Sequence, residues 1–300
     1  MRKRPAGARP RYGRTVTILS RPVAAVIAAA AVSVGLVAPA ARAASAAPKT
    51  ETASAGDVTA TYTYRDAGGG KWADMRLTVT RGGVTAFDAV PEVSGRFGCE
   101  APYCAPAGLG TRPSLRVLDV DGDGEPEVIV DLFTGGAHCC VVAEILRWTG
   151  AAYATAARNF ADFGYTLDPP AAPGAPATFV TGDARFAYAF ASFADSAFPV
   201  RLLTYVGGSW HDVTRDHPES LRADAARWAK SYHRRRSGSR SLGVLAAWAA
   251  DEYRLGHQAQ VHRFLRNELR AGRLRGDRYW PRGKAYISVL ERRLRAWGYT

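Results

Sequence analysis

Acidic residues crowd one short stretch of the chain, residues 118–131, with the sequence LDVDGDGEPEVIVD. Counted from Asp119, the side chains of Asp119, Asp121 and Asp123 occupy positions 1, 3 and 5, and Glu127 occupies position 9. Calcium prefers about six to eight oxygen ligands, and alternating aspartates with glycines between them let a short backbone curl around one ion. Without a cation these carboxylates would repel one another. The spacing therefore predicts a calcium site.

The loop differs from an EF-hand. Its position 12 is Val130, where an EF-hand has a bidentate glutamate. The residues that follow, 128–133, are mostly β-branched or aromatic, which favours a strand over an exiting helix. Residues 115–118 have similar character, so we expect a strand–loop–strand unit.

A strand–loop–strand unit with the pattern D-x-D-G-D-G-x-x-E resembles the calcium loop of the FG-GAP (VCBS-type) repeat, which builds the β-propellers of integrin α-subunits. The resemblance implies side-chain ligands from Asp119, Asp121, Asp123 and Glu127 and a backbone carbonyl ligand from Glu125. Those repeats usually have aspartate at position 9, where this chain has a longer glutamate.

The resemblance extends over residues 115–140, and a degenerate copy follows near residues 167–190. The second copy begins at Leu167-Asp168 and has alanines and prolines in place of the acids, so it could not hold an ion. The offset of about 50 residues is typical of propeller blades. A closed propeller takes about four to eight blades. Two copies therefore predict a propeller fragment or a sandwich-like sheet.

The first 43 residues have the composition of an export signal. They hold eight Lys/Arg and no acidic residue, and residues 23–37 are uninterruptedly small or apolar. Ala41-Arg42-Ala43 offers a small-x-small cleavage site. The apolar core is shorter than the roughly 20 residues of a spanning helix. We expect a secreted chain with a Sec-type signal cleaved near Ala43; the alternative is an uncleaved anchor.

Four cysteines constrain the exported part: Cys99, Cys104, Cys139 and Cys140. In an oxidising compartment they imply two disulfides, with three pairings. A bridge between adjacent residues opposes the preferred geometry. We therefore expect two cross-links from the first pair of cysteines to the second. A Cys–His nucleophile or a zinc site with His138 would need reduced thiols, which export disfavours.

Charge divides the remainder. Residues 44–215 hold 13 Lys/Arg and 19 Asp/Glu, a net of −6, whereas residues 216–300 hold 19 and 8, a net of +11. This asymmetry predicts two units, a β domain at 57–215 and a basic helical domain at 216–300. Residues 44–56, rich in Ala, Ser and Thr, are expected to be a disordered lead-in.

Hydrophobic periodicity predicts an α+β fold, in which a disulfide-tied, mostly antiparallel β domain precedes four amphipathic helices. Alternation and turns indicate strands at 58–64, 75–80, 141–148, 186–190, 202–206 and 210–213. Helical spacing indicates helices at 221–233, 242–256, 261–272 and 281–297.

Arginines of the helical domain could form an anion-binding surface; the candidates are Arg234, Arg235, Arg236, Arg292 and Arg293. Outside a cell such a surface suits an anionic cell-wall polymer, and another extracellular protein is a further candidate partner. The alternative is an arginine-rich solvated face that reflects biased base composition. No fold signature favours nucleic acid.

These patterns favour a secreted, non-enzymatic calcium-binding module whose ion stiffens a sheet. The sequence contains no G-x-S-x-G, H-E-x-x-H or Walker-type motif. The alternative is a secreted hydrolase that acts on cell-wall or lipid polymers and uses calcium structurally.

Overall fold

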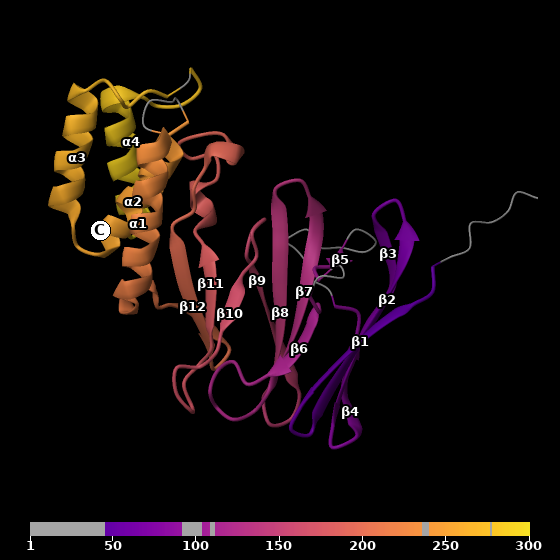
Figure 1. The fold of residues 1–300 in the computed structure, drawn as a ribbon. Coiled ribbons are helices and arrows are strands. Elements are labelled where there is room, and N and C mark those ends of the chain that lie inside the picture. The colour runs from indigo at the N-terminus through magenta and orange to yellow at the C-terminus, as the bar shows by residue number, and fades with distance from the viewer. Residues whose placement is uncertain (1–45, 92–103, 109–111, 236–239, 277) are drawn as a thin grey trace, which may run out of the picture. The chain divides into compact units, whose positions relative to one another are not determined.

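The computed structural model describes residues 46–91, 104–108, 112–235, 240–276 and 278–300 (Figure 1). Residues 44–300 belong to one compact unit. The expected export signal at 1–43, Cys99 and Arg236 lie outside the described residues.

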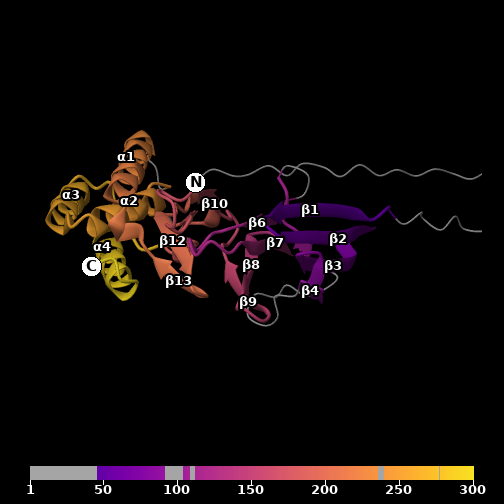
Figure 2. The ribbon, with the colours of Figure 1, turned by 90° about the horizontal axis from the view of Figure 1, so that it is seen from below.

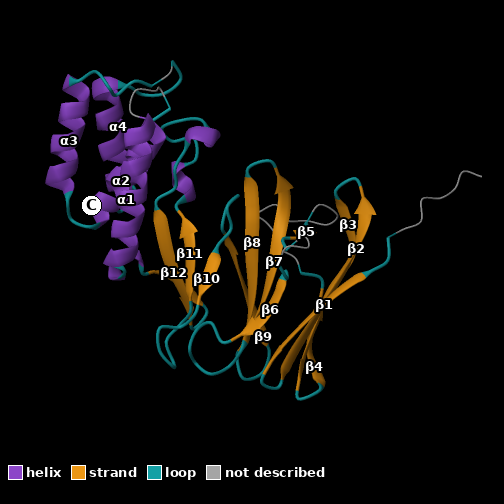
Figure 3. Cartoon of the chain, in the orientation of Figure 1, coloured by secondary structure: helices purple, strands orange, loops and turns teal. Residues whose placement is uncertain are grey.

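Within the described ranges, three antiparallel sheets precede the helices (Figure 3). In the first sheet each strand pairs with the next along the chain; the strands are β1 (Lys49–Ala55), β2 (Val58–Gly68), β3 (Lys71–Arg81) and β4 (Val84–Ala89). The second sheet has the order β5-β7-β8-β9, and β6 also pairs with β7; its strands are β5 (Ala105–Pro106), β6 (Leu115–Leu118), β7 (Glu127–Gly136), β8 (Cys139–Trp148) and β9 (Tyr153–Asn159). The third sheet again follows chain order; its strands are β10 (Thr166–Asp168), β11 (Thr178–Gly182), β12 (Val200–Val206) and β13 (Ser209–Asp212).

The central strands β7 and β8 are buried on both faces. Val128, Val130 and Leu132 pack with the inward side chains of the first sheet, such as Tyr62 and Leu77. The alternate residues of the same strands, among them Ile129 and Ile145, pack with Phe179, Leu203 and Tyr205 of the third sheet. This double burial explains why residues 128–130 are continuously apolar rather than alternating.

In the part of the chain that the structure describes, four helices follow the sheets (Figures 1 and 2). They are α1 (Pro218–Arg235), α2 (Leu242–Arg254), α3 (Gln258–Arg270) and α4 (Gly283–Ala296). The 3-10 turns η1 (Ala184–Phe186) and η2 (Phe193–Asp195) lie between β11 and β12, and η3 (Thr214–Asp216) connects β13 to α1. Almost every residue of α2 is buried, so α2 is the centre of the helical core. Phe186 and Phe190 also belong to this core, although they precede the helical region in sequence. The predicted α+β class, antiparallel sheets and four C-terminal helices are confirmed.

Two predictions about elements are wrong. Residues 49–55 of the expected disordered lead-in form β1, which pairs with β2 over its whole length. The predicted strand at 186–190 is instead the η1 turn followed by irregular backbone, with Tyr188 at a φ of 54°. Its aromatic residues alternate in sequence because Phe186 and Phe190 enter the helical core while Tyr188 is 49% exposed.

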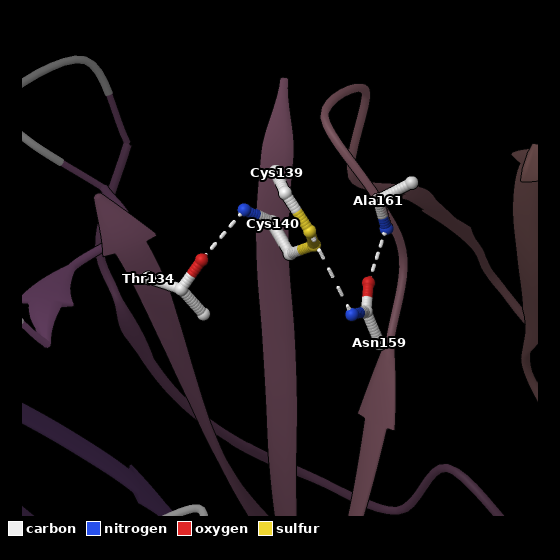
Figure 4. The surroundings of a disulfide bond; sticks show 5 residues. All are labelled: Thr134, Cys139, Cys140, Asn159 and Ala161. Atoms are coloured by element: carbon white, nitrogen blue, oxygen red, sulfur yellow. Dashed lines mark hydrogen bonds between the residues drawn. A yellow bond between two sulfur atoms is a disulfide. The ribbon is translucent and has the colours of Figure 1, made fainter. Parts of the chain in front are cut away.

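The expected pair of disulfide cross-links is also wrong. Cys139 is bonded to its neighbour Cys140 at the start of β8 (Figure 4). The peptide between them is cis and their Cα atoms lie 3.1 Å apart. The prediction took the short Cα separation and the rigid peptide of neighbouring residues to oppose such a bond. Cys104 is also disulfide-bonded.

Among the helices that the structure describes, we find none with the length and apolar character needed to cross a membrane.

Candidate metal centre

The acidic loop connects β6 to β7, and it brings three of the predicted ligands together. Single carboxylate oxygens of Asp119, Asp121 and Glu127 lie within 4.8 Å of one another. Leu118 pairs with Glu127 across the two strands, so the antiparallel register fixes both ends of the loop. The three side chains thus form an all-oxygen cluster.

The loop backbone is wound around the Asp119 carboxylate. This carboxylate accepts hydrogen bonds from the backbone N–H groups of Gly122, at 2.7 Å, and Gly124, at 3.0 Å. Both glycines have positive φ, 81° and 90°, a conformation that other residues rarely adopt. The glycines between the aspartates are therefore required by the curl of the loop.

Glu127 is the most confined of the three acids, with no exposed surface. Its Oε2 accepts a hydrogen bond from the Val120 N–H at 3.0 Å, but its Oε1 has no hydrogen-bond partner among the described residues. Burial, and then repulsion from the neighbouring aspartates, raises the pKa of Glu127 to about 8. A buried oxygen without a partner is costly, and a hard cation would satisfy it. The donor set fits calcium on this observation.

Arg147 of β8 supplies a positive charge that the sequence analysis missed. Its Nε lies 2.9 Å from Asp121 Oδ2, and its Nη2 lies 2.8 Å from Asp123 Oδ2. Asp121 belongs to the three-residue cluster and Asp123 does not. The signal in the sequence was small: Arg147 is one of two charged residues in the apolar stretch 141–148.

Glu125 contacts another element through its side chain, which lies 2.8 Å from the Arg81 guanidinium of β3. The resemblance implies that the Glu125 backbone carbonyl is a calcium ligand. Among the described residues no contact of this carbonyl tests that role, so it stays a prediction.

Two further segments touch the loop. The Gly207 N–H, in the turn between β12 and β13, donates to Asp121 Oδ2 at 3.3 Å. The Ala177 N–H, just before β11, donates to the Val120 carbonyl at 2.9 Å. The acidic loop thus contacts the third sheet as well as its own.

Cys139 and Cys140, next to His138 in the sequence, are bonded to each other. Because the Cys139 and Cys140 sulfurs are bonded to each other, they offer neither a thiolate nucleophile nor thiolate ligands. His138 stacks on Phe193, with ring centroids 4.1 Å apart.

The predicted anion-binding arginines are dispersed. Arg234 and Arg235 are exposed in the last turn of α1, and Arg292 is exposed on α4. Arg293 packs inward instead: it donates to the Ala189 carbonyl and lies over the Phe190 ring. Arg293 is therefore a structural residue as much as a surface charge.

Comparison with known proteins found little similarity. No family model matches the chain, and no solved structure matches it. A curated protein of Synechocystis sp., described as a probable thylakoid lumen protein, is 27% identical over 154 residues. The match covers 47% of this chain and 44% of that protein, so the chain spans less than half of the relative's length.

Proposed function

We propose that this chain is an exported, non-enzymatic calcium-binding module in which the ion completes the loop between β6 and β7. The observation that carries the proposal is the fully buried Glu127, whose Oε1 has no hydrogen-bond partner among the described residues and shares a cluster with Asp119 and Asp121. An all-oxygen donor set favours calcium over softer metals such as zinc. The relative's name supports an exported location, because the thylakoid lumen lies across a membrane from the site of synthesis.

Asp119, Asp121 and Glu127 would hold the ion, and Asp123 would join them if Arg147 released it. Calcium would supply the charge that neutralises the cluster. With Kd about 10⁻⁴ M and about 1 mM external calcium, binding would stabilise the folded state by roughly 1.4 kcal/mol. That is a useful increment for a marginally stable protein.

We also propose that the β region is a propeller fragment. Strands β6–β9 and β10–β13 each form a four-stranded antiparallel meander, the arrangement of a propeller blade. The unit β10–β11 resembles β6–β7 in layout: residues 169–177 connect two paired antiparallel strands, as residues 119–126 connect β6 to β7. These correspondences support a live and a degenerate copy of one repeat.

The exposed arginines of the helices support association with an anionic partner of the cell envelope. Arg234, Arg235 and Arg292 are available for such contacts in the part of the chain that the structure describes. Binding to wall fractions that weakens as salt is raised would support this role, and salt-independent binding would contradict it.

Calorimetric titration of the full chain with calcium, after treatment with EGTA, tests the metal site. We expect saturable binding and a thermal midpoint that rises by several degrees with calcium but not with equal magnesium. Glu127→Gln, which keeps the shape of the side chain and removes its charge, should abolish both effects. Glu219→Gln, at an exposed position on α1, is the matched control and should leave them unchanged. Identical midpoints of the parent protein in calcium and in EGTA would reject the proposal.

A further inference from the structure

We propose that a cavity of about 480 Å³ between the third sheet and α1 binds an acidic saccharide. Its volume lies within the usual range for small-molecule sites, about 300–1,000 Å³. Its walls come from the segment 162–166, from β11, from η2 and the segment after it, and from α1. The cavity is separate from the acidic loop, and none of the proposed calcium ligands lines it.

Aromatic rings form the walls of the cavity: Phe163, Phe193, Phe198 and Trp228. The Phe163 and Phe198 centroids are 4.8 Å apart, and those of Phe193 and Phe198 are 5.8 Å apart. The rings continue outward from Phe193 to His138, which is exposed beside the Cys139–Cys140 bond. Flat rings in a row suit the apolar C–H faces of successive sugar rings.

The backbone is strained at two places near these rings; Tyr188 does not line the cavity, but its ring centroid lies 5.6 Å from that of Phe193. Ala161 and Tyr188, neither of them glycine, have φ values of 56° and 54°. Such left-handed conformations cost free energy and gather at functional sites. The aromatic side chains at or near these positions are partly exposed to solvent: Phe163, two residues after Ala161, is 38% exposed, and Tyr188 is 49% exposed. Burial of these rings in the core does not account for the strain.

Gly182 of β11 makes room for the aromatic walls. A Cβ atom at this position would lie 2.8 Å from Phe198 Cβ and 3.3 Å from the Phe163 ring. A glycine inside a strand often marks a close approach of another group. Here it lets two phenyl rings lie directly over the sheet.

Polar groups around the walls select the ligand. Arg112 is exposed and donates from Nη1 to the Tyr165 carbonyl at 3.3 Å. Arg227 is held by Asp224 over the Trp228 ring, 4.0 Å from its centroid, with 60% of its side chain exposed. Asp224 already neutralises Arg227, and the lining also contains the Asp162 carboxylate. Arg112 is therefore the guanidinium in the lining that can meet a carboxylate of the ligand.

The same lining also suits hydroxyl groups, because Asp162 and Thr166 can accept hydrogen bonds from them. A fatty acid would instead favour aliphatic walls, and Val180 and Val200 are the aliphatic side chains in the described lining. Ring faces for stacking, the Arg112 guanidinium for a carboxylate and acceptors for hydroxyls together suit a uronic-acid sugar. This inference depends on the proposed function only in placing the protein at the cell envelope.

Calorimetric titration of the full chain with galacturonate and glucuronate oligosaccharides of two to four sugars tests the site. The titrations are run in EGTA, so that calcium bound by the sugars or by the acidic loop plays no part; failure of the calcium site therefore leaves this test intact. We expect saturable binding that is at least tenfold tighter than that of the uncharged galactose and glucose oligosaccharides. Phenylacetate, an aromatic carboxylate without hydroxyls, should bind more weakly than the acidic sugars.

Variants at exposed positions separate the cavity from general charge. Arg112→Gln and Phe163→Ser should each weaken acidic-sugar binding about tenfold without changing the thermal midpoint by more than a few degrees. Arg263→Gln removes an exposed arginine on α3 and should bind like the parent. The proposal is overturned if no acidic sugar binds, if neutral sugars or phenylacetate bind as tightly, or if folded cavity variants bind like the parent.

Discussion

Arg147 of β8 places a cation against two of the aspartates of the acidic loop. The Arg147 guanidinium contacts Asp121 and Asp123 at 2.9 and 2.8 Å, so it neutralises part of the negative charge. The same charge opposes a calcium ion, because it occupies Asp123 and repels a second cation. Arg147 therefore stabilises the metal-free loop at the expense of calcium affinity.

Arg147→Gln should separate these two effects. We expect the variant to be less stable than the parent in EGTA and to bind calcium about three- to tenfold more tightly, or up to about 1.4 kcal/mol. Calcium titration of both proteins, with a thermal midpoint at each concentration, measures the two changes. Arg65→Gln, which removes an arginine paired with Asp74 on the first sheet, is the control. Weaker calcium binding by Arg147→Gln would contradict a competing role.

Asp251 of α2 is a second acidic residue whose environment opposes its charge. It has no exposed surface, and neither carboxylate oxygen has a hydrogen-bond partner among the described residues. Burial, followed by the nearby Asp224 carboxylate, raises the pKa of Asp251 to about 10. The folded state therefore holds a proton on Asp251 that the unfolded state releases near its ordinary pKa of 3.8.

This difference predicts a pH dependence of stability. Because the folded state binds more protons, the free energy of unfolding falls as pH rises from about 4 to about 10, by at most about 1.4 kcal/mol per pH unit. Asp251→Asn keeps a neutral side chain at every pH, so it should be more stable than the parent at pH 8 and similar near pH 4. Urea unfolding at pH 5, 7 and 9 measures the slope. Asp216→Asn, at an exposed site, should keep the parent's slope, and an unchanged slope in Asp251→Asn would count against the prediction.

At the scale of elements, the sequence predicted the helices and most strands because their patterns are local. The helical spacing after Pro218 gave α1 to α4, and the glycine pair at 207–208 gave the β12–β13 hairpin. β1 was missed because its composition is polar. Its Glu51 carboxylate accepts hydrogen bonds from the Ser114 and Leu115 N–H groups, at 2.6 and 3.0 Å. These residues are distant in the sequence, so no local pattern predicts the contact.

The acidic loop shows the same division. Spacing predicted Asp119, Asp121 and Glu127 as neighbours, since one turn of backbone brings them together. It could not predict that Asp123 would pair with Arg147, because that contact depends on the register between β7 and β8. The adjacent disulfide was missed because a bond between neighbouring cysteines opposes the preferred disulfide geometry.

Two glycines of the loop offer a matched test of its contact with the next loop. A Cβ on Gly122 would lie 2.5 Å from the Gly174 carbonyl oxygen, whereas a Cβ on Gly124 would meet nothing within 4 Å. Both have positive φ, so alanine introduces backbone strain of about 1–2 kcal/mol at either position. Gly122→Ala should lose more, by a further 1–3 kcal/mol for the steric clash, roughly the cost of overpacking.

Urea unfolding of the two variants in EGTA measures this difference without involving the ion. Equal losses of stability would show that the acidic loop and the loop at 169–177 do not pack as closely as the Gly122 environment indicates.

At the scale of the whole molecule, the acidic loop is where separate sheets exchange hydrogen bonds. Its two ends are strands of the second sheet, while Asp121 and Val120 accept hydrogen bonds from Gly207 and Ala177 of the third-sheet region. The sheets also share the core around Ile129 and Phe179. An ion held by Asp121 would therefore act on the junction between sheets, beyond the loop itself.

Hydrogen exchange should reveal this coupling. On addition of calcium to the full chain, we expect the amides of Gly207 and Ala177 to exchange up to about tenfold more slowly, together with those of residues 119–127, because roughly 1.4 kcal/mol of added stability opposes the opening of the junction. The amides of α3, which packs on α2 and α4, serve as the internal reference and should change less. Glu127→Gln should show no calcium-dependent protection at either place. Protection confined to residues 119–127 would mean that the ion orders only its own loop. Protection spread equally over α3 would mean that the ion stabilises the whole fold. Because Gly207 contacts Asp121 directly, we expect protection at the junction that is greater than that of α3.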